Sequence, residues 1–104
     1  MARPPKRYEN IKRQHPQIFQ AIEELGQTLS QAGPIDAKTA QLIQLAAAVA
    51  QRSEGAVHSH TRRALESGAN AAEVRHAVML LTSTVGLPTM MAALSWADDI
   101  LESK

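Results

Sequence analysis

Apolar residues recur at the three- and four-residue spacing of an amphipathic helix after His15-Pro16. They are Ile18, Ile22, Leu25 and Leu29. The segment, residues 16–33, ends at Gly33-Pro34, a pair that stops a helix. A shorter helical turn is expected over residues 8–14.

Residues 37–51, AKTAQLIQLAAAVAQ, are apolar on nearly all sides. Asp36 stands before them, where its carboxylate can accept the free backbone N–H groups of a helix start. A helix without a polar face is enclosed by neighbouring elements or by another subunit. The polar residues 52–54 end this helix. A new helical pattern begins at Glu54, and Gly68 closes it as a C-cap.

Two more helices complete the pattern. Asn70 and Glu73 form a capping box in front of residues 71–86. Gly86-Leu87-Pro88 breaks that helix, and Pro88 is tolerated at the first position of the last one. No stretch alternates apolar and polar residues over more than a few positions. The pattern therefore predicts an all-α fold of about five main helices.

Composition adds an expectation about assembly. Hydrophobic residues make up 44% of the 104 residues but include one Phe, one Trp and one Tyr, so small aliphatic side chains dominate. Helices of this kind present broad, shallow apolar faces that a small domain covers poorly, which predicts a homo-oligomer. The chain has no cysteine, which excludes disulfides, thiolate metal sites and thiol redox catalysis.

Positive charge is concentrated at the start of the chain. Residues 1–13 carry five basic residues and one acidic residue, which divides the chain into a basic arm or short helix, residues 1–14, and a helical domain, residues 15–104. No aromatic platform or recognition helix accompanies the arm, so a solvated start is favoured and nucleic acid is disfavoured as a partner. No signal peptide or membrane span is visible, and we expect a cytoplasmic protein without membrane contact.

Residues 53–60, SEGAVHSH, form a polar island after the most apolar stretch. At about 100° per residue, one helical stripe collects several of them. These are Ser53, Ala56, Val57 and His60. His58 lies about 200° from His60, so the two histidines do not share a metal site, and no metal is expected. Glu54 and His58 form an i, i+4 pair, expected to be a surface ion pair on the opposite side.

His60 is the candidate for proton transfer, because an imidazole changes charge near neutral pH. The alternative is a structural histidine that donates to a backbone carbonyl. Gln41 and Gln44 on the preceding helix can bind a ligand or simply bridge helices or subunits. A serine hydrolase is disfavoured because no nucleophile-elbow motif is present.

From about His15 to Ile100 the chain resembles the carboxymuconolactone decarboxylase family, whose superfamily includes the alkylhydroperoxidase D proteins. The matching stretches, in the family's order and spacing, are PQIFQAIEELGQTL, GPIDAKTAQLIQLAAAVAQ, HTRRALESGANAAEV and VGLPTMMAAL. The resemblance implies an all-helical domain with a central antiparallel helical hairpin. It also implies trimers or hexamers whose pockets lie between helices near subunit contacts.

The family's redox branch carries Cys-x-x-Cys-x-x-x-His and an upstream glutamate, a relay that reduces peroxide. In this chain the motif histidine falls on His60 and the cysteines on Ser53 and Ala56. The glutamate falls on Gln41. A hydroxyl forms neither a reversible sulfenate nor a disulfide, so peroxidase activity of this kind is excluded and an inherited peroxidase label is disfavoured.

The decarboxylase branch can lack both cysteines and keep the histidine, which implies cofactor-free loss of carbon dioxide from a small carboxylated lactone. Such chemistry needs a cationic or hydrogen-bonding group that binds the carboxylate, and a general acid that returns a proton. We expect His60 as the general acid, with Gln41 and Ser53 as hydrogen-bond partners. The residues expected to bind the substrate are Arg52, Arg62, Arg63 and Ala56. The alternative is a non-catalytic oligomeric binding or scaffold protein on the same fold.

Overall fold

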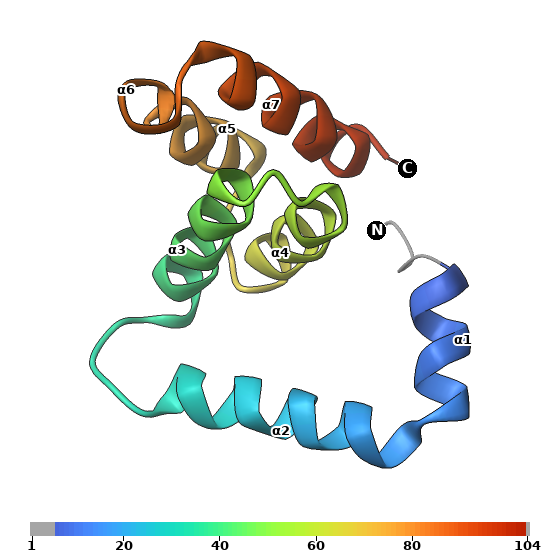
Figure 1. The fold of residues 1–104 in the computed structure, drawn as a ribbon. Helices are drawn as coiled ribbons and strands as arrows, with labels where there is room; N and C mark the ends of the chain where they lie inside the picture. Colours follow the sequence, from blue (N-terminus) through green and yellow to red (C-terminus); the bar gives the residue numbers. More distant parts are fainter. Residues whose placement is uncertain (1–5, 104) are drawn as a thin grey trace. The chain divides into compact units, whose positions relative to one another are not determined.

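The computed structural model describes residues 6–103, which fall into two compact units divided between Asp36 and Ala37. Helices α1 and α2 form the first unit, and α3 to α7 form the second (Figure 1). No strand occurs among the described residues, which confirms the predicted all-α fold. The predicted division into an arm, residues 1–14, and a domain, residues 15–104, stays a prediction.

The first unit is a pair of helices, α1 (Lys6–Gln14) and α2 (Pro16–Gln31). Pro16 opens α2, where its missing N–H costs no helical hydrogen bond. The rings of Tyr8 and Phe19 meet edge to face with centroids 5.3 Å apart, and Lys12 Nζ lies 2.6 Å from Glu23 Oε2. Neither helix has a buried residue. The predicted apolar stripe of α2 is therefore exposed.

The second unit is built on a hairpin of α3 (Ala37–Ala50) and α4 (Glu54–Glu66). Ser53 N donates to Ala48 O at the turn, and Arg52 there has a left-handed φ of 54°. Gln41, seven residues before Ala48, meets His60, seven residues after Ser53, so the two helices run antiparallel. This confirms the expected central antiparallel hairpin.

Three further helices complete the second unit: α5 (Ala71–Met79), α6 (Thr82–Val85) and α7 (Leu87–Leu101). Helix α7 packs against α4 and α5 (Figure 1). Their shared core is made of small and branched apolar side chains. Its fully buried members include Leu45, Val49, Val57, Val74, Val78, Ala93 and Ala97.

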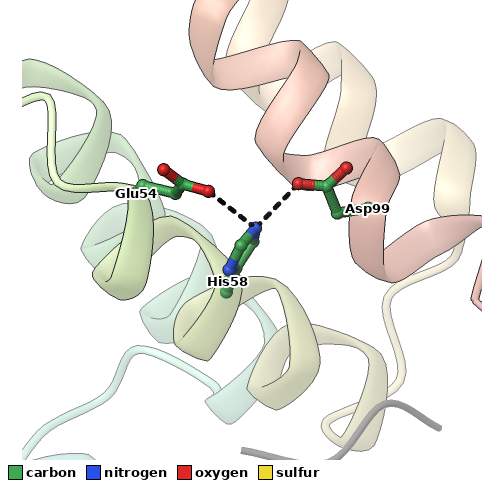
Figure 2. A group of neighbouring side chains, drawn as sticks. All are labelled: Glu54, His58 and Asp99. Carbon is green, nitrogen blue, oxygen red and sulfur yellow. Dashed lines mark hydrogen bonds and ion pairs between the residues drawn. The ribbon is translucent and has the colours of Figure 1, made fainter. Parts of the chain in front are cut away.

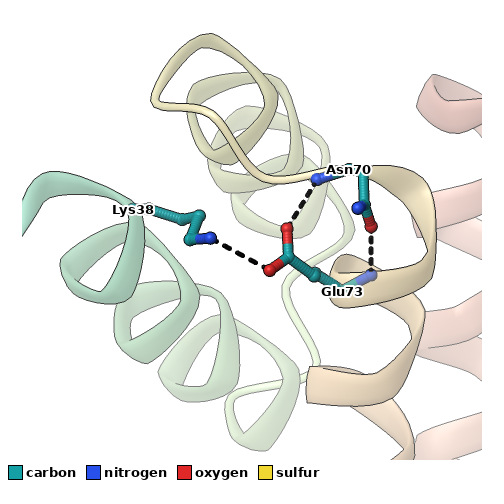
Figure 3. A network of polar contacts seen from close by, with 3 residues as sticks. All are labelled: Lys38, Asn70 and Glu73. Carbon is teal, nitrogen blue, oxygen red and sulfur yellow. Dashed lines mark hydrogen bonds and ion pairs between the residues drawn. The ribbon is translucent and has the colours of Figure 1, made fainter.

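Two of the predicted cap signals, Gly68 and the Asn70–Glu73 box, are confirmed. Gly68, with a φ of 104°, follows the end of α4. Asn70 Oδ1 accepts from Glu73 N at 2.8 Å, and Glu73 Oε1 accepts from Asn70 N at 3.0 Å. Figure 3 shows this capping box and the ion pair from Lys38 Nζ on α3 to Glu73 Oε2, 3.0 Å long. The box therefore also links α5 to the start of α3.

The single helix predicted over residues 71–86 is wrong, because the structure divides it. Helix α5 ends at Met79, and Leu81 N donates three residues back to Val78 O. The hydroxyl of Thr82 donates to Met79 O at 2.7 Å. A threonine hydroxyl that bonds the preceding carbonyls competes with the helical ladder, and Thr82 heads a run of poor helix formers. The short helix α6 is the result.

Apolar side chains also remain exposed on the second unit. They are Ile43, Met79, Leu80, Leu87 and Met91, each more than 40% exposed. Helix α3 is buried at Leu45, Ala48 and Val49 but open at Ile43, so this chain alone encloses only part of it. Within residues 6–103, no helix is long and apolar enough to cross a membrane.

Candidate functional site

The hairpin brings together two of the predicted site residues, His60 of α4 and Gln41 of α3. His60 Nδ1 lies 3.0 Å from Gln41 Oε1, and both side chains are half-buried. The antiparallel register of α3 and α4 places these two residues on facing turns. An amide and an imidazole in contact across a helical hairpin form the centre of the candidate site.

This hydrogen bond assigns the proton on the imidazole. With Gln41 Oε1 as acceptor, His60 Nδ1 carries the proton, and Nε2 is the unprotonated nitrogen of the neutral ring. Burial lowers the pKa of His60 below its ordinary value, and the positive charge of Arg63 lowers it further. Both effects favour the neutral form of the ring, in which Nε2 is unprotonated.

Ser53 has a structural task at the turn. It is the N-cap of α4, and its Oγ accepts from Ala56 N at 3.3 Å. Among the described residues, no hydrogen bond joins Ser53 to His60. Ala56 packs against the core. Ser53 therefore stands at the helix start with extended backbone, and of the predicted site residues it is Gln41 that shares a hydrogen bond with His60.

The three candidate arginines have different surroundings. Arg52 is exposed in the turn and donates from Nη1 to Thr89 Oγ1 on α7. Arg62 is 9% exposed and has interactions of its own. Arg63 is exposed and close enough to His60 to lower its pKa. Of the three, Arg63 is the one whose charge acts on the candidate acid.

His58 contacts a residue that the sequence analysis missed. Its Nε2 lies 3.0 Å from Asp99 Oδ2 on α7 and 4.0 Å from Glu54 Oε2, as Figure 2 shows. The Glu54–His58 pair is present as predicted, but Asp99 is the nearer partner. The His58 side chain is 19% exposed, so it is not the surface residue that the spacing suggested. Asp99 is 41 positions away, and no local signal could have found it.

One cavity of about 360 Å³ lies along α1, lined by Tyr8, Glu9, Lys12 and Arg13. None of the predicted site residues lines it. It therefore adds nothing to the site on the hairpin.

The second unit is thus an all-helical domain with a central helical hairpin, and the hairpin carries an imidazole–amide pair. The chain has no cysteine. The sequence model of the carboxymuconolactone decarboxylase family matches residues 16–99, and the chain belongs to this family. The match confirms the resemblance described above.

A relative from Haemophilus influenzae, described as an uncharacterized protein, is 37% identical over 59 residues. These residues are 57% of this chain and 52% of the relative, so the chain spans about half the length of the curated relative it matches. No solved structure matches the chain.

Proposed function

We propose that the protein catalyses cofactor-free acid–base chemistry, of the decarboxylase or lyase type, on a small carboxylated metabolite or lactone. The observation that carries this proposal is the 3.0 Å contact between His60 Nδ1 and Gln41 Oε1 on the hairpin. Family membership supports the same chemistry at the level of the family.

Gln41 is suited to hold His60 through a full proton-transfer cycle. Neutral imidazole with its proton on Nδ1 donates to Gln41 Oε1, and imidazolium, which carries protons on both nitrogens, does the same. The hydrogen bond therefore persists while Nε2 gains and loses its proton. Gln41 acts as a positioning residue for His60.

The proposed step uses the His60 imidazolium as general acid. The bond between the substrate carbon and its carboxylate breaks, carbon dioxide leaves, and the electron pair spreads into the adjacent lactone. Nε2–H then delivers its proton to the carbon. Because its pKa is lowered, protonated His60 is a stronger acid than an ordinary histidine. After the step, Nε2 takes up a new proton from solvent.

The anionic substrate needs a positively charged side chain beside His60 to bind its carboxylate. Arg63 is the first choice because it is exposed and its charge already reaches the imidazole. Ser53 and Ala56 are in contact at the start of α4, and Ser53 can donate its hydroxyl proton while its oxygen accepts from Ala56 N. Arg52 and Arg62 are further candidates, each with a partner already in the structure.

The test compares the wild type with His60→Gln on a panel of carboxylated lactones, following carbon dioxide release. His76→Gln, at an exposed histidine in the last turn of α5, is the matched control. We expect His60→Gln to lower kcat/KM by about 10²- to 10⁴-fold, the usual share of a general acid, and His76→Gln to leave it unchanged. Full activity in His60→Gln would refute the proposal.

A non-catalytic binding or scaffold role is the second candidate, favoured by the amount of exposed apolar surface. The α2 stripe, Ile18, Ile22, Leu25 and Leu29, is 56 to 64% exposed at every member. An exposed apolar face of this kind is typical of a surface that another copy of the chain covers. We therefore propose a homo-oligomer, and the family resemblance favours a trimer or a hexamer. Binding of a carboxylated lactone without turnover would favour this role.

A further inference from the structure

We propose that Glu54, His58 and Asp99 bind a divalent transition-metal ion of the zinc class between α4 and α7. The site is separate from the His60–Gln41 pair, because His58 and His60 take their partners from different helices. It does not depend on the proposed lyase chemistry.

The fold places the three side chains around one point. Glu54 and His58 are i, i+4 neighbours in the first two turns of α4, and Asp99 comes from the last turns of α7, which packs against α4. Figure 2 shows both carboxylates turned toward His58 Nε2. The three ligand atoms all lie within 4.8 Å of one another.

These distances suit a single ion. Ligand atoms held at about 2.0 to 2.2 Å from zinc lie at most about 4.4 Å apart, twice the bond length. Two of the three separations, 3.0 and 4.0 Å, already meet that limit. The carboxylates are more than half exposed and can adjust by a rotamer change, whereas the His58 side chain, 19% exposed, is held in place.

Two carboxylates share one imidazole at this site. The ion pairs that the structure gives Glu54 and Asp99 are both with His58. The adjacent Asp98 contrasts with them, because Arg75 Nε pairs with it at 2.9 Å. A single Nε2–H serves only one carboxylate, and even a protonated His58 leaves one negative charge. A divalent ion would neutralise both carboxylates and bind the neutral imidazole.

The donor set selects the metal. One imidazole nitrogen and two carboxylate oxygens suit Zn²⁺ and its first-row neighbours, whereas Mg²⁺ and Ca²⁺ prefer oxygen ligands alone. Three protein ligands leave at least one coordination position for water or another donor. The bound ion would link the start of α4 to the end of α7.

The experiment measures binding of Zn²⁺ to the full, tag-free chain by calorimetry at pH 7.5, with Co²⁺ absorption as a second readout. The ligand variants are Glu54→Gln, His58→Gln and Asp99→Asn. The matched controls are Asp98→Asn, one residue along α7, and His76→Gln, an exposed histidine of α5. Circular dichroism before titration shows which variants are folded.

We expect saturable binding of a single ion per chain and a rise in Tm with Zn²⁺. Each ligand variant should weaken binding at least about tenfold, since even the loss of an outer partner of a metal ligand costs that much. Both controls should bind like the wild type. If His58→Gln does not fold, Asp99→Asn, altered at an exposed carboxylate, decides alone. Absence of saturable binding, or binding unchanged in folded ligand variants, would overturn the proposal.

Discussion

Replacing Gln41 with glutamate should reverse the shift in the pKa of His60. In the wild type, burial and Arg63 both disfavour the imidazolium, and the neutral amide of Gln41 does not offset them. A carboxylate at this position would stand where Gln41 Oε1 now accepts from Nδ1, 3.0 Å away. The variant adds a negative charge to an existing hydrogen bond with almost no change in side-chain shape.

The size of the effect follows from the contact distance. Two opposite charges about 4 Å apart attract by about 4 kcal/mol at an effective dielectric of about 20, and by about 1 kcal/mol in bulk water. His60 is half-buried, so solvent screening and the desolvation of the new carboxylate reduce the larger figure. We expect the pKa of His60 to rise by about one pH unit or more in Gln41→Glu, equivalent to about 1.4 kcal/mol.

The assay is an NMR titration of the His60 Cε1–H resonance in the wild type and the variant. Gln44→Glu is the control, because Gln44 lies on the next turn of α3 and is exposed, so its charge is screened. The pH dependence of stability should change sign with the pKa. In the wild type folding favours the neutral ring, so the free energy of unfolding decreases as pH falls below about 6.5, the ordinary pKa of histidine. In Gln41→Glu folding favours the imidazolium, so the free energy of unfolding decreases as pH rises from about 6.5 through the raised pKa. An unchanged or lowered His60 pKa in Gln41→Glu would refute the assigned Nδ1–Oε1 contact.

Three further predictions concern the scaffold. Asn70→Ala should lower the free energy of unfolding by about 1 kcal/mol in chemical denaturation, because the capping box is lost, whereas Asn70→Asp should retain most of it. The backbone N–H of Asn70 and the ammonium of Lys38 hold the pKa of Glu73 below its ordinary value of 4.5. The stability from Glu73 is therefore complete above that value and is lost as pH falls through the lowered pKa, and Glu73→Gln should flatten this part of the profile. Leu45→Ala, at a side chain with no exposure, should cost about 2 to 5 kcal/mol. Ile43→Ala on the same helix, 52% exposed, should cost under about 0.5 kcal/mol in the monomer, and equal losses would contradict the core assignment.

Local signals predicted the helices well because each depends on a few neighbouring residues. Gly68 and the Asn70–Glu73 box end one helix and begin the next where the sequence placed them. The break after Met79 was missed because Leu80 and Leu81 continue the apolar pattern. The hydroxyl of Thr82, which bonds Met79 O, competes with the helix there without altering hydrophobicity.

The candidate site was predictable only in part, because spacing describes one helix at a time. Helical geometry separated His58 from His60, and each histidine takes its partner from a different helix. The resemblance singled out Gln41, 19 positions from His60, and the hairpin register brings them together. Neither helical spacing nor the family resemblance indicated Asp99, because it lies on α7 and belongs to no motif in the sequence.

The partners of the two histidines determine what each can do. His60 faces a neutral amide, so burial and Arg63 control its pKa, and the ring can release a proton readily. His58 faces two carboxylates, the arrangement on which the proposed metal site rests. A glutamate at position 41 would give His60 an anionic partner as well and would raise its pKa. In the proposed mechanism the neutral Gln41 holds the His60 ring without raising its pKa, so burial and Arg63 keep protonated His60 a stronger acid than an ordinary histidine.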